Sequence, residues 1–132
     1  MSFPKLRYEA LWLVLVSACL PAAEVTAEQV EFFEKKIRPV LVEKCYSCHN
    51  SKMKTPMGGL RLDSREALLQ GGDSGKAVVP GDPAKSRLVL AISYKHELKM
   101  PPTGKLPDDQ IADLVKWVEL GVPDTRDRKS VV

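Results

Sequence analysis

The chain has 132 residues, the length of one ordinary domain, and a formal net charge of +3. Hydrophobic residues make up 44% and charged residues 28%, globular proportions that exclude a wholly disordered chain. Aromatic residues make up only 6%, few for a core filled by protein side chains alone. No apolar run reaches the roughly 18 residues of a membrane-spanning helix. Neither the net charge nor any basic helix supports nucleic-acid binding.

The first 27 residues have the three-part layout of a secretory signal peptide. Lys5 and Arg7 form a short basic start, and residues 10–20 are an apolar run of 11. Small residues follow at positions 22, 23 and 27. The layout predicts export to the periplasm or another extracytoplasmic space, with a mature domain that begins at Glu28.

A second interpretation of the same segment is a bacterial lipoprotein signal. Residues 16–19 read Val-Ser-Ala-Cys, in which Cys19 would become the lipidated first residue. The lipid would tether the domain to a membrane, and the residues after it would serve as a linker. The alternative is that Cys19 is only a small residue of the apolar run and is discarded.

Residues 28–44 are predicted to form an amphipathic helix. Five apolar residues recur at helical spacing: Val30, Phe33, Ile37, Val40 and Leu41. Pro39 lacks an N–H, so a kink or break is expected there. Thr26 and Gln29 fit a capping box, but only if the signal is cut upstream of Thr26.

The segment Cys45-Tyr46-Ser47-Cys48-His49 is the C-x-x-C-H motif of covalent c-type haem attachment. Two thiols at this spacing reach the two vinyl groups of one porphyrin edge, and the adjacent imidazole can then bind the iron. A redox-active disulfide would need an alternating strand and helix pattern, which is absent. A zinc site would need a second Cys or His pair, whereas the one other histidine is His96.

The middle of the chain alternates loops with short helices. Residues 50–59 and 71–81 are predicted loops, and 60–62 a short extended piece. Asp63 is the predicted N-cap of a helix through Gln70, and Asp82-Pro83 opens the next helix.

Pro107 opens the last predicted helix, which Gly121 ends. Its apolar stripe consists of Ile111, Leu114, Val115 and Val118. Residues 124–132 are charged and are expected to be a flexible tail. No strand pair is predicted, so the fold class is mainly α, with short helices and long loops.

A second axial ligand of the iron is expected from Met100. It precedes Pro101-Pro102, which stiffen the backbone, and it lies between the third and last helices. His96 is the alternative, giving a bis-histidine site, and Met100 would then be ordinary apolar filling. Met53 and Met57 are too close to His49 in sequence to cross easily to the far face of the ring.

The whole pattern resembles a class I cytochrome c and, more narrowly, the planctomycete-type cytochrome c domain. The matching pieces span about residues 28–123: Ile37 to Leu41 before the motif, Gly59 to Asp63, Val79 to Pro83, Met100 to Pro102, and Trp117 to Gly121. The resemblance implies one covalent haem c held by Cys45 and Cys48, with His49 and Met100 as axial ligands. It also implies a fold in which the first and last helices cross over the haem.

The function expected from this resemblance is one-electron transfer by a non-enzymatic carrier with a protein redox partner. Six loop lysines could steer an acidic partner: Lys52, Lys54, Lys76, Lys95, Lys99 and Lys105. They could equally be solubilising. Two alternatives are a haem-based sensor or peroxidase-like module with a labile sixth ligand, and a haem-bearing docking module of a larger surface complex. Family members are often N-terminal parts of longer exported proteins, so the chain is either a free carrier or a shortened relative of them.

Overall fold

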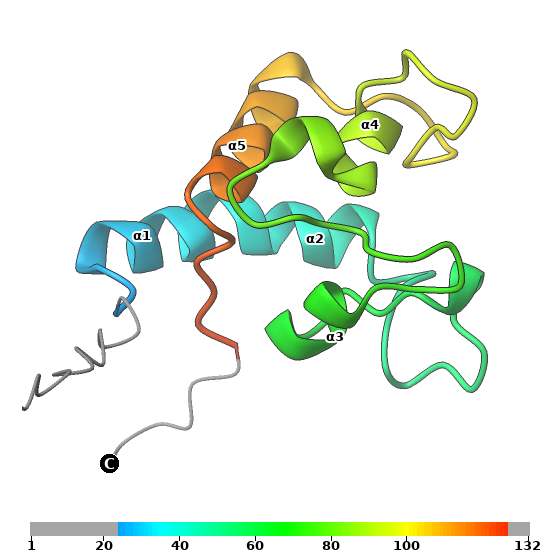
Figure 1. The fold of residues 1–132 in the computed structure, drawn as a ribbon, viewed down its shortest axis with the longest axis horizontal. Helices are drawn as coiled ribbons and strands as arrows, with labels where there is room; N and C mark the ends of the chain where they lie inside the picture. The colour runs from blue at the N-terminus through cyan, green and yellow to red at the C-terminus, as the bar shows by residue number, and fades with distance from the viewer. Residues whose placement is uncertain (1–23, 127–132) are drawn as a thin grey trace, which may run out of the picture.

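The computed structural model describes residues 24–126 as helices joined by long loops (Figure 1). Its α-helices are α1 (Ala27–Phe32), α2 (Arg38–Lys44), α3 (Arg65–Gln70), α4 (Arg87–Ile92) and α5 (Asp108–Glu119). Across residues 24–126, extended pairing is limited to one isolated bridge between Gly72 and Gly75. This confirms the mainly α expectation. The expected signal segment up to residue 23, with Cys19, lies outside the described residues.

The first predicted helix is present as two helices, α1 and α2, joined by the π-helical turn Phe33–Ile37. The Arg38 N–H bonds to the Phe33 carbonyl, the wider hydrogen-bond spacing of a π turn. Pro39 therefore lies in the first turn of α2, where a missing N–H costs little. The kink or break that was expected at Pro39 is instead the π-helical turn that precedes this proline. α1 and α2 nevertheless run end to end (Figure 1).

A capping box begins α1. The Thr26 hydroxyl accepts from the Gln29 N–H at 3.2 Å, and the Gln29 side-chain carbonyl accepts from the Thr26 N–H at 3.0 Å. Two backbone N–H groups that the helix leaves free are thus satisfied. A signal cut between Ala27 and Glu28 would remove this cap.

Ser64, not Asp63, is the N-cap of α3, so the predicted cap is off by one residue. The Ser64 hydroxyl accepts from the Ala67 N–H at 3.1 Å. Asp63 instead accepts from the N–H and the hydroxyl of Ser51, each at 2.8 Å. Its carboxylate closes the loop that follows the C-x-x-C-H motif, a long-range role that local spacing does not reveal.

The core lies where α5 packs across the π-helical turn. The rings of Phe33 and Trp117 are 5.9 Å apart at 37°, and both side chains are fully buried. Further apolar residues from every part of the described chain surround them: Ile37, Leu41, Leu62, Leu68, Val78, Ile92, Leu106, Leu114, Val118 and Val122. The apolar stripes predicted for the first and last helices thus meet in one cluster, except for Val30 and Val115, which lie outside it.

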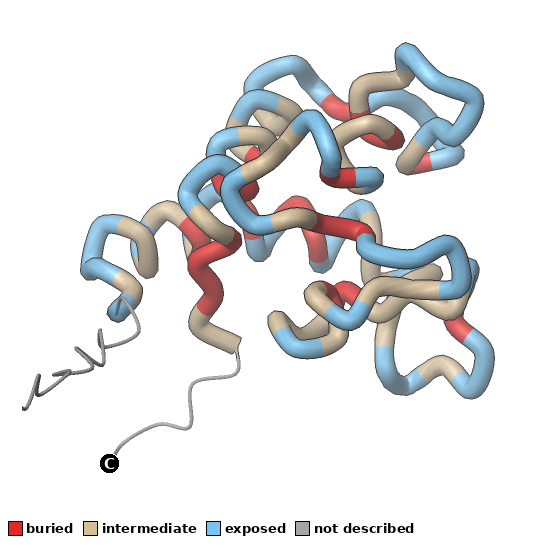
Figure 2. The backbone as a smooth tube through the Cα atoms, viewed as in Figure 1, coloured by how far each residue is buried: buried red, intermediate tan, exposed pale blue. Residues whose placement is uncertain are grey.

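The packed chain continues past α5 and includes the start of the expected tail. The Trp117 indole N–H donates to the Pro123 carbonyl at 2.8 Å, and Asp124 is only 5% exposed. Figure 2 shows this segment buried against the rest of the molecule. The flexible tail expected from Asp124 therefore does not begin there: residues 124–126 are packed because Thr125 bonds to Glu34 and Arg126 bonds to Tyr46 and Leu62.

The start of the described chain lies far from two of its loops. The entry to α1 lies at one end of the long axis, and the loops 50–59 and 93–104 extend at the other (Figure 1). No helix within residues 24–126 is long and apolar enough to cross a membrane.

The capping box generates a stability prediction. Thr26→Ala removes the hydroxyl that caps α1 and should lower the free energy of unfolding by about 1 kcal/mol. Urea unfolding of protein purified with Thr26 retained, followed by circular dichroism, measures this loss. Thr55→Ala, at an exposed loop position, is the matched control and should leave the midpoint unchanged. Equal midpoints for the two variants would show that the cap contributes nothing.

Candidate functional site

The C-x-x-C-H residues form a tight turn at the end of α2. The Cys45 N–H bonds to the Leu41 carbonyl at 3.0 Å, so Cys45 closes the helix. The Cys48 and His49 N–H groups both bond back to the Cys45 carbonyl, at 3.2 and 3.0 Å. This turn brings the three predicted residues together, and both thiols are free rather than joined in a disulfide.

Burial sets the chemistry of the first thiol. It raises the pKa of Cys45 to about 11, with a smaller contribution from the nearby Cys48. Cys45 packs against the core cluster, so its sulfur faces apolar surroundings. At neutral pH this sulfur is therefore a protonated thiol.

The imidazole of His49 is fixed by a backbone carbonyl. Its Nδ1 lies 3.2 Å from the Leu60 oxygen. A carbonyl oxygen can only accept, so Nδ1 carries the proton and the lone pair is on Nε2. The Leu62 N–H also donates to the His49 carbonyl at 3.0 Å. Residues 60–62 thus hold both the backbone and the ring of His49, in the way that metal-binding histidines are commonly oriented.

Met100 is held by a different part of the chain. Its N–H donates to the Ala91 carbonyl of α4 at 3.1 Å, and its side chain is partly buried. The Tyr94 hydroxyl donates to the carbonyl of Pro101, the next residue. The loop that carries Met100 is therefore tied to the end of α4 at two points.

One small cavity lies between the end of α2 and the segment after Met100, but neither His49 nor Met100 lines it. Its volume is about 190 Å³, and its lining includes Lys44, which precedes Cys45, and Pro101, which follows Met100. Thr103, Gly104, Lys105, Leu106 and Pro107 complete it. The chain before the C-x-x-C-H turn and the chain after Met100 thus face a common space, although they are more than fifty residues apart in sequence.

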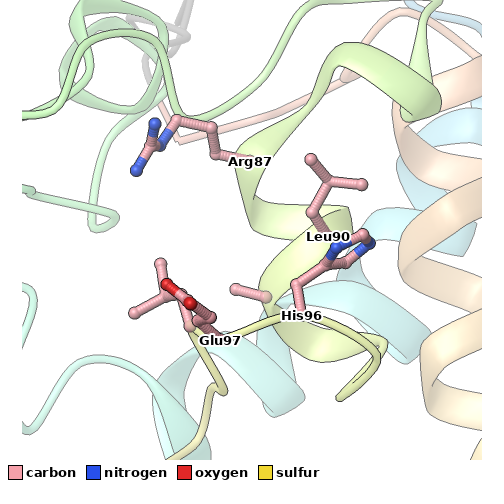
Figure 3. Close-up of a pocket in the computed structure, with 6 residues that line it drawn as sticks. Arg87, Leu90, His96 and Glu97 are labelled. Atoms are coloured by element: carbon pink, nitrogen blue, oxygen red, sulfur yellow. The ribbon is translucent and has the colours of Figure 1, made fainter.

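The alternative ligands are placed differently. His96 is exposed and lines a second cavity, of about 330 Å³, between α4 and the loop before Met100. In Figure 3 its ring lies beside Leu90, while Arg87 and Glu97 extend on the other side of the pocket. Met57 is 61% exposed, and its N–H bonds to the Cys48 carbonyl at 3.0 Å, which keeps it close to the motif.

The six loop lysines are all exposed, as their expected role requires. Two of them have partners: Lys105 pairs with Asp108 at 2.8 Å, and the Lys76 ammonium donates to the Leu69 carbonyl at 3.3 Å. Exposed pairs of this kind are worth little in stability, so an approaching acidic surface could displace them.

The donor set suits a c-type haem. Two free thiols, an imidazole with its Nε2 lone pair available and a thioether on a tethered loop are the groups that such a haem needs. Within residues 24–126, no three His, Cys, Asp or Glu side chains come together as a metal-ion site. Sequence inspection missed the supporting residues, Leu60 and Tyr94, because a backbone carbonyl carries no motif and a lone tyrosine no spacing signal.

Comparison with known families supports the resemblance. Residues 45–104, which include the C-x-x-C-H turn and Met100, match the family model described as planctomycete cytochrome C. No curated protein sequence and no solved structure matches the chain.

Burial of Cys45 generates a reactivity prediction for the haem-free chain. At pH 8, iodoacetamide should alkylate Cys45 at least about tenfold more slowly than a cysteine in an unstructured peptide, because its thiolate is scarce. Peptide mass spectrometry of the Cys48→Ala variant isolates Cys45, and the same chain in urea is the control. Circular dichroism identifies conditions in which the haem-free chain is folded, and in those conditions a rate equal to the rate in urea would contradict the burial of this thiol.

Proposed function

Because residues 45–104 match the planctomycete cytochrome C family model, we propose that the protein is an exported c-type cytochrome that transfers single electrons. The observation that carries this proposal is the C-x-x-C-H turn, with His49 Nδ1 tied to the Leu60 carbonyl. The bound haem would supply a one-electron iron couple, and the chain would supply attachment, axial ligands and an apolar enclosure.

The two cysteines of the motif are the proposed sites of covalent haem attachment. The Cys45 and Cys48 thiols would each add across a vinyl group, S–H across C=C, to give two thioethers and no leaving group. Their place in one turn after α2 supports a single shared porphyrin edge. We therefore propose one haem c, within a class I cytochrome c-like arrangement of the helices.

His49 and Met100 are the proposed axial ligands. The fixed Nδ1 proton of His49 supports iron binding through Nε2. Met100 is supported by its place on a loop that is tied to the end of α4. A neutral thioether favours the ferrous ion, so this ligand pair would give a raised reduction potential.

The partner would be a protein with an acidic docking surface. Five of the six lysines lie in the loops 50–59, 71–81 and 93–104, and the sixth directly follows the last of these. Attraction between exposed charges acts mainly on the association rate and falls with salt. No enzymatic reaction is assigned to the protein in this proposal.

The site of action would be outside the cytoplasm. The basic start and the 11-residue apolar run support export. Retention of Cys19 as a lipidated first residue would keep Thr26 and its capping box in the mature chain, whereas a cut after Ala27 would not. The two forms would therefore differ at the start of α1, and only the lipoprotein form would tether the domain to a membrane.

The second cavity favours one alternative function, a haem-based sensor or peroxidase-like module. His96 lines this cavity together with Arg87 and Glu97, polar groups that a ligand-binding site would use. In that case the bond to Met100 would be labile, and a small ligand would take its place.

Met100→Ala tests the carrier against the sensor. The variant should keep its covalent haem, lose the methionine–iron absorption band and show a lower reduction potential, because the thioether no longer stabilises the ferrous ion. Met57→Ala, at an exposed position, is the matched control and should behave like the wild type. Optical redox titration measures both effects. An intact band in Met100→Ala would overturn the ligand assignment, and ready carbon monoxide binding by the reduced wild type would favour the sensor.

The double variant Cys45→Ala/Cys48→Ala tests how far folding depends on haem. Without thioethers the chain should be recovered haem-free and poorly folded, because its protein core is small and poor in aromatic residues. Near-ultraviolet circular dichroism reports this through Trp117. A sharp cooperative unfolding transition in the variant would contradict the expectation.

A further inference from the structure

The last described residue, Arg126, is a buried charge. Its side chain is 5% exposed, and that of its partner Asp124 is 0% exposed. The Arg126 Nε lies 2.9 and 3.1 Å from the two carboxylate oxygens, and its backbone N–H also donates to Asp124 at 3.0 Å. Removing two charges from water costs several kcal/mol per ion, which must be offset by further partners.

Those partners lie around the C-x-x-C-H turn. Arg126 Nη1 donates to the Tyr46 hydroxyl and to the Leu62 carbonyl. Its guanidinium carbon is 5.2 Å from the centre of the Phe33 ring, a cation–π distance. Tyr46 lies between the two motif cysteines, and burial raises its pKa, so its hydroxyl stays protonated and can accept from the cation.

The same contacts lead to the proximal histidine. Leu62, which accepts from Arg126, donates its own N–H to the His49 carbonyl at 3.0 Å. Two residues earlier, the Leu60 oxygen holds His49 Nδ1 at 3.2 Å. Residues 60–62 therefore lie between Arg126 and His49, bonded to both.

We propose that Arg126 is a positioning residue for the axial histidine. The planar guanidinium group of Arg126 donates hydrogen bonds to Asp124, Tyr46 and Leu62 at the same time. These bonds fix the C-x-x-C-H turn and the segment that orients the His49 ring. The residue does not itself touch the iron. This role rests on the proposed function, since it requires His49 to be an iron ligand.

Arg126→Lys is the first test. Lysine keeps the charge but is a point donor without the fork, so it can pair with Asp124 while releasing Tyr46 or Leu62. In the ferric holoprotein, proton NMR of the four haem methyl groups reports the orientation of the axial ligands. We expect a changed spread of these resonances, with the covalent haem and the methionine–iron band retained.

Arg65→Lys is the matched control. Arg65 also anchors the segment after α5, because it donates to the Val122 carbonyl at 3.1 Å and to the Gly121 carbonyl at 3.5 Å, but these bonds do not involve Tyr46 or Leu62. It should leave the haem methyl resonances as in the wild type. If the haem methyl resonances changed equally in Arg126→Lys and Arg65→Lys, Arg126 would only anchor the segment after α5, and the proposal would be overturned.

A second variant guards against loss of folding. Asp124→Asn/Arg126→Met removes both charges, so no unpaired ion is left buried, and thermal unfolding should change little. The donors to Tyr46 and Leu62 are nevertheless lost, so the haem methyl spread should still change. If both this variant and Arg126→Lys kept the haem methyl resonances of the wild type, the positioning role of Arg126 would be overturned, but the proposed function would stand. A wild-type protein without covalent haem would instead overturn the proposed function, and this inference with it.

Discussion

The contact between Phe33 and Trp117 holds together the parts of the molecule that carry chemistry. These two fully buried rings join the π-helical turn to α5, so they fix how the first and last helices cross. From that crossing the chain extends in two directions. α2 leads directly to the C-x-x-C-H turn, and Trp117 binds the Pro123 carbonyl that precedes Asp124 and Arg126. One contact in a small core therefore positions both the C-x-x-C-H turn and the segment that carries Asp124 and Arg126.

Away from this crossing, single hydrogen bonds replace regular secondary structure. His49 depends on the Leu60 carbonyl and the Leu62 N–H, and the Met100 loop on Ala91 and Tyr94. Loops fixed in this way keep little apolar packing of their own. His49 and Met100 are thus each held by directional bonds, and these bonds come from different parts of the chain.

Local patterns in the sequence predicted the features that depend on neighbouring residues. Most of the apolar stripes of the first and last helices are buried where expected, although Val30 and Val115 lie outside the core cluster. The family resemblance carried by the motif and Met100 was confirmed over residues 45–104. Features set by tertiary contacts were not predictable in this way. Ser64 replaces Asp63 as a helix cap because Asp63 binds Ser51, twelve residues earlier. The charged residues after Pro123 suggested a solvated tail, since no local spacing reveals that Arg126 meets Tyr46 across eighty positions.

The placement of the entry to α1 determines which surface a tether attached there leaves free. The entry to α1 lies at one end of the long axis, and the loops 50–59 and 93–104 occupy the other (Figure 1). A lipid tether attached before α1 would therefore hold the domain at the end opposite these loops. Both loops, with four of the exposed lysines, would then project away from the anchor, so anchoring and collision with a mobile partner would not compete for the same face.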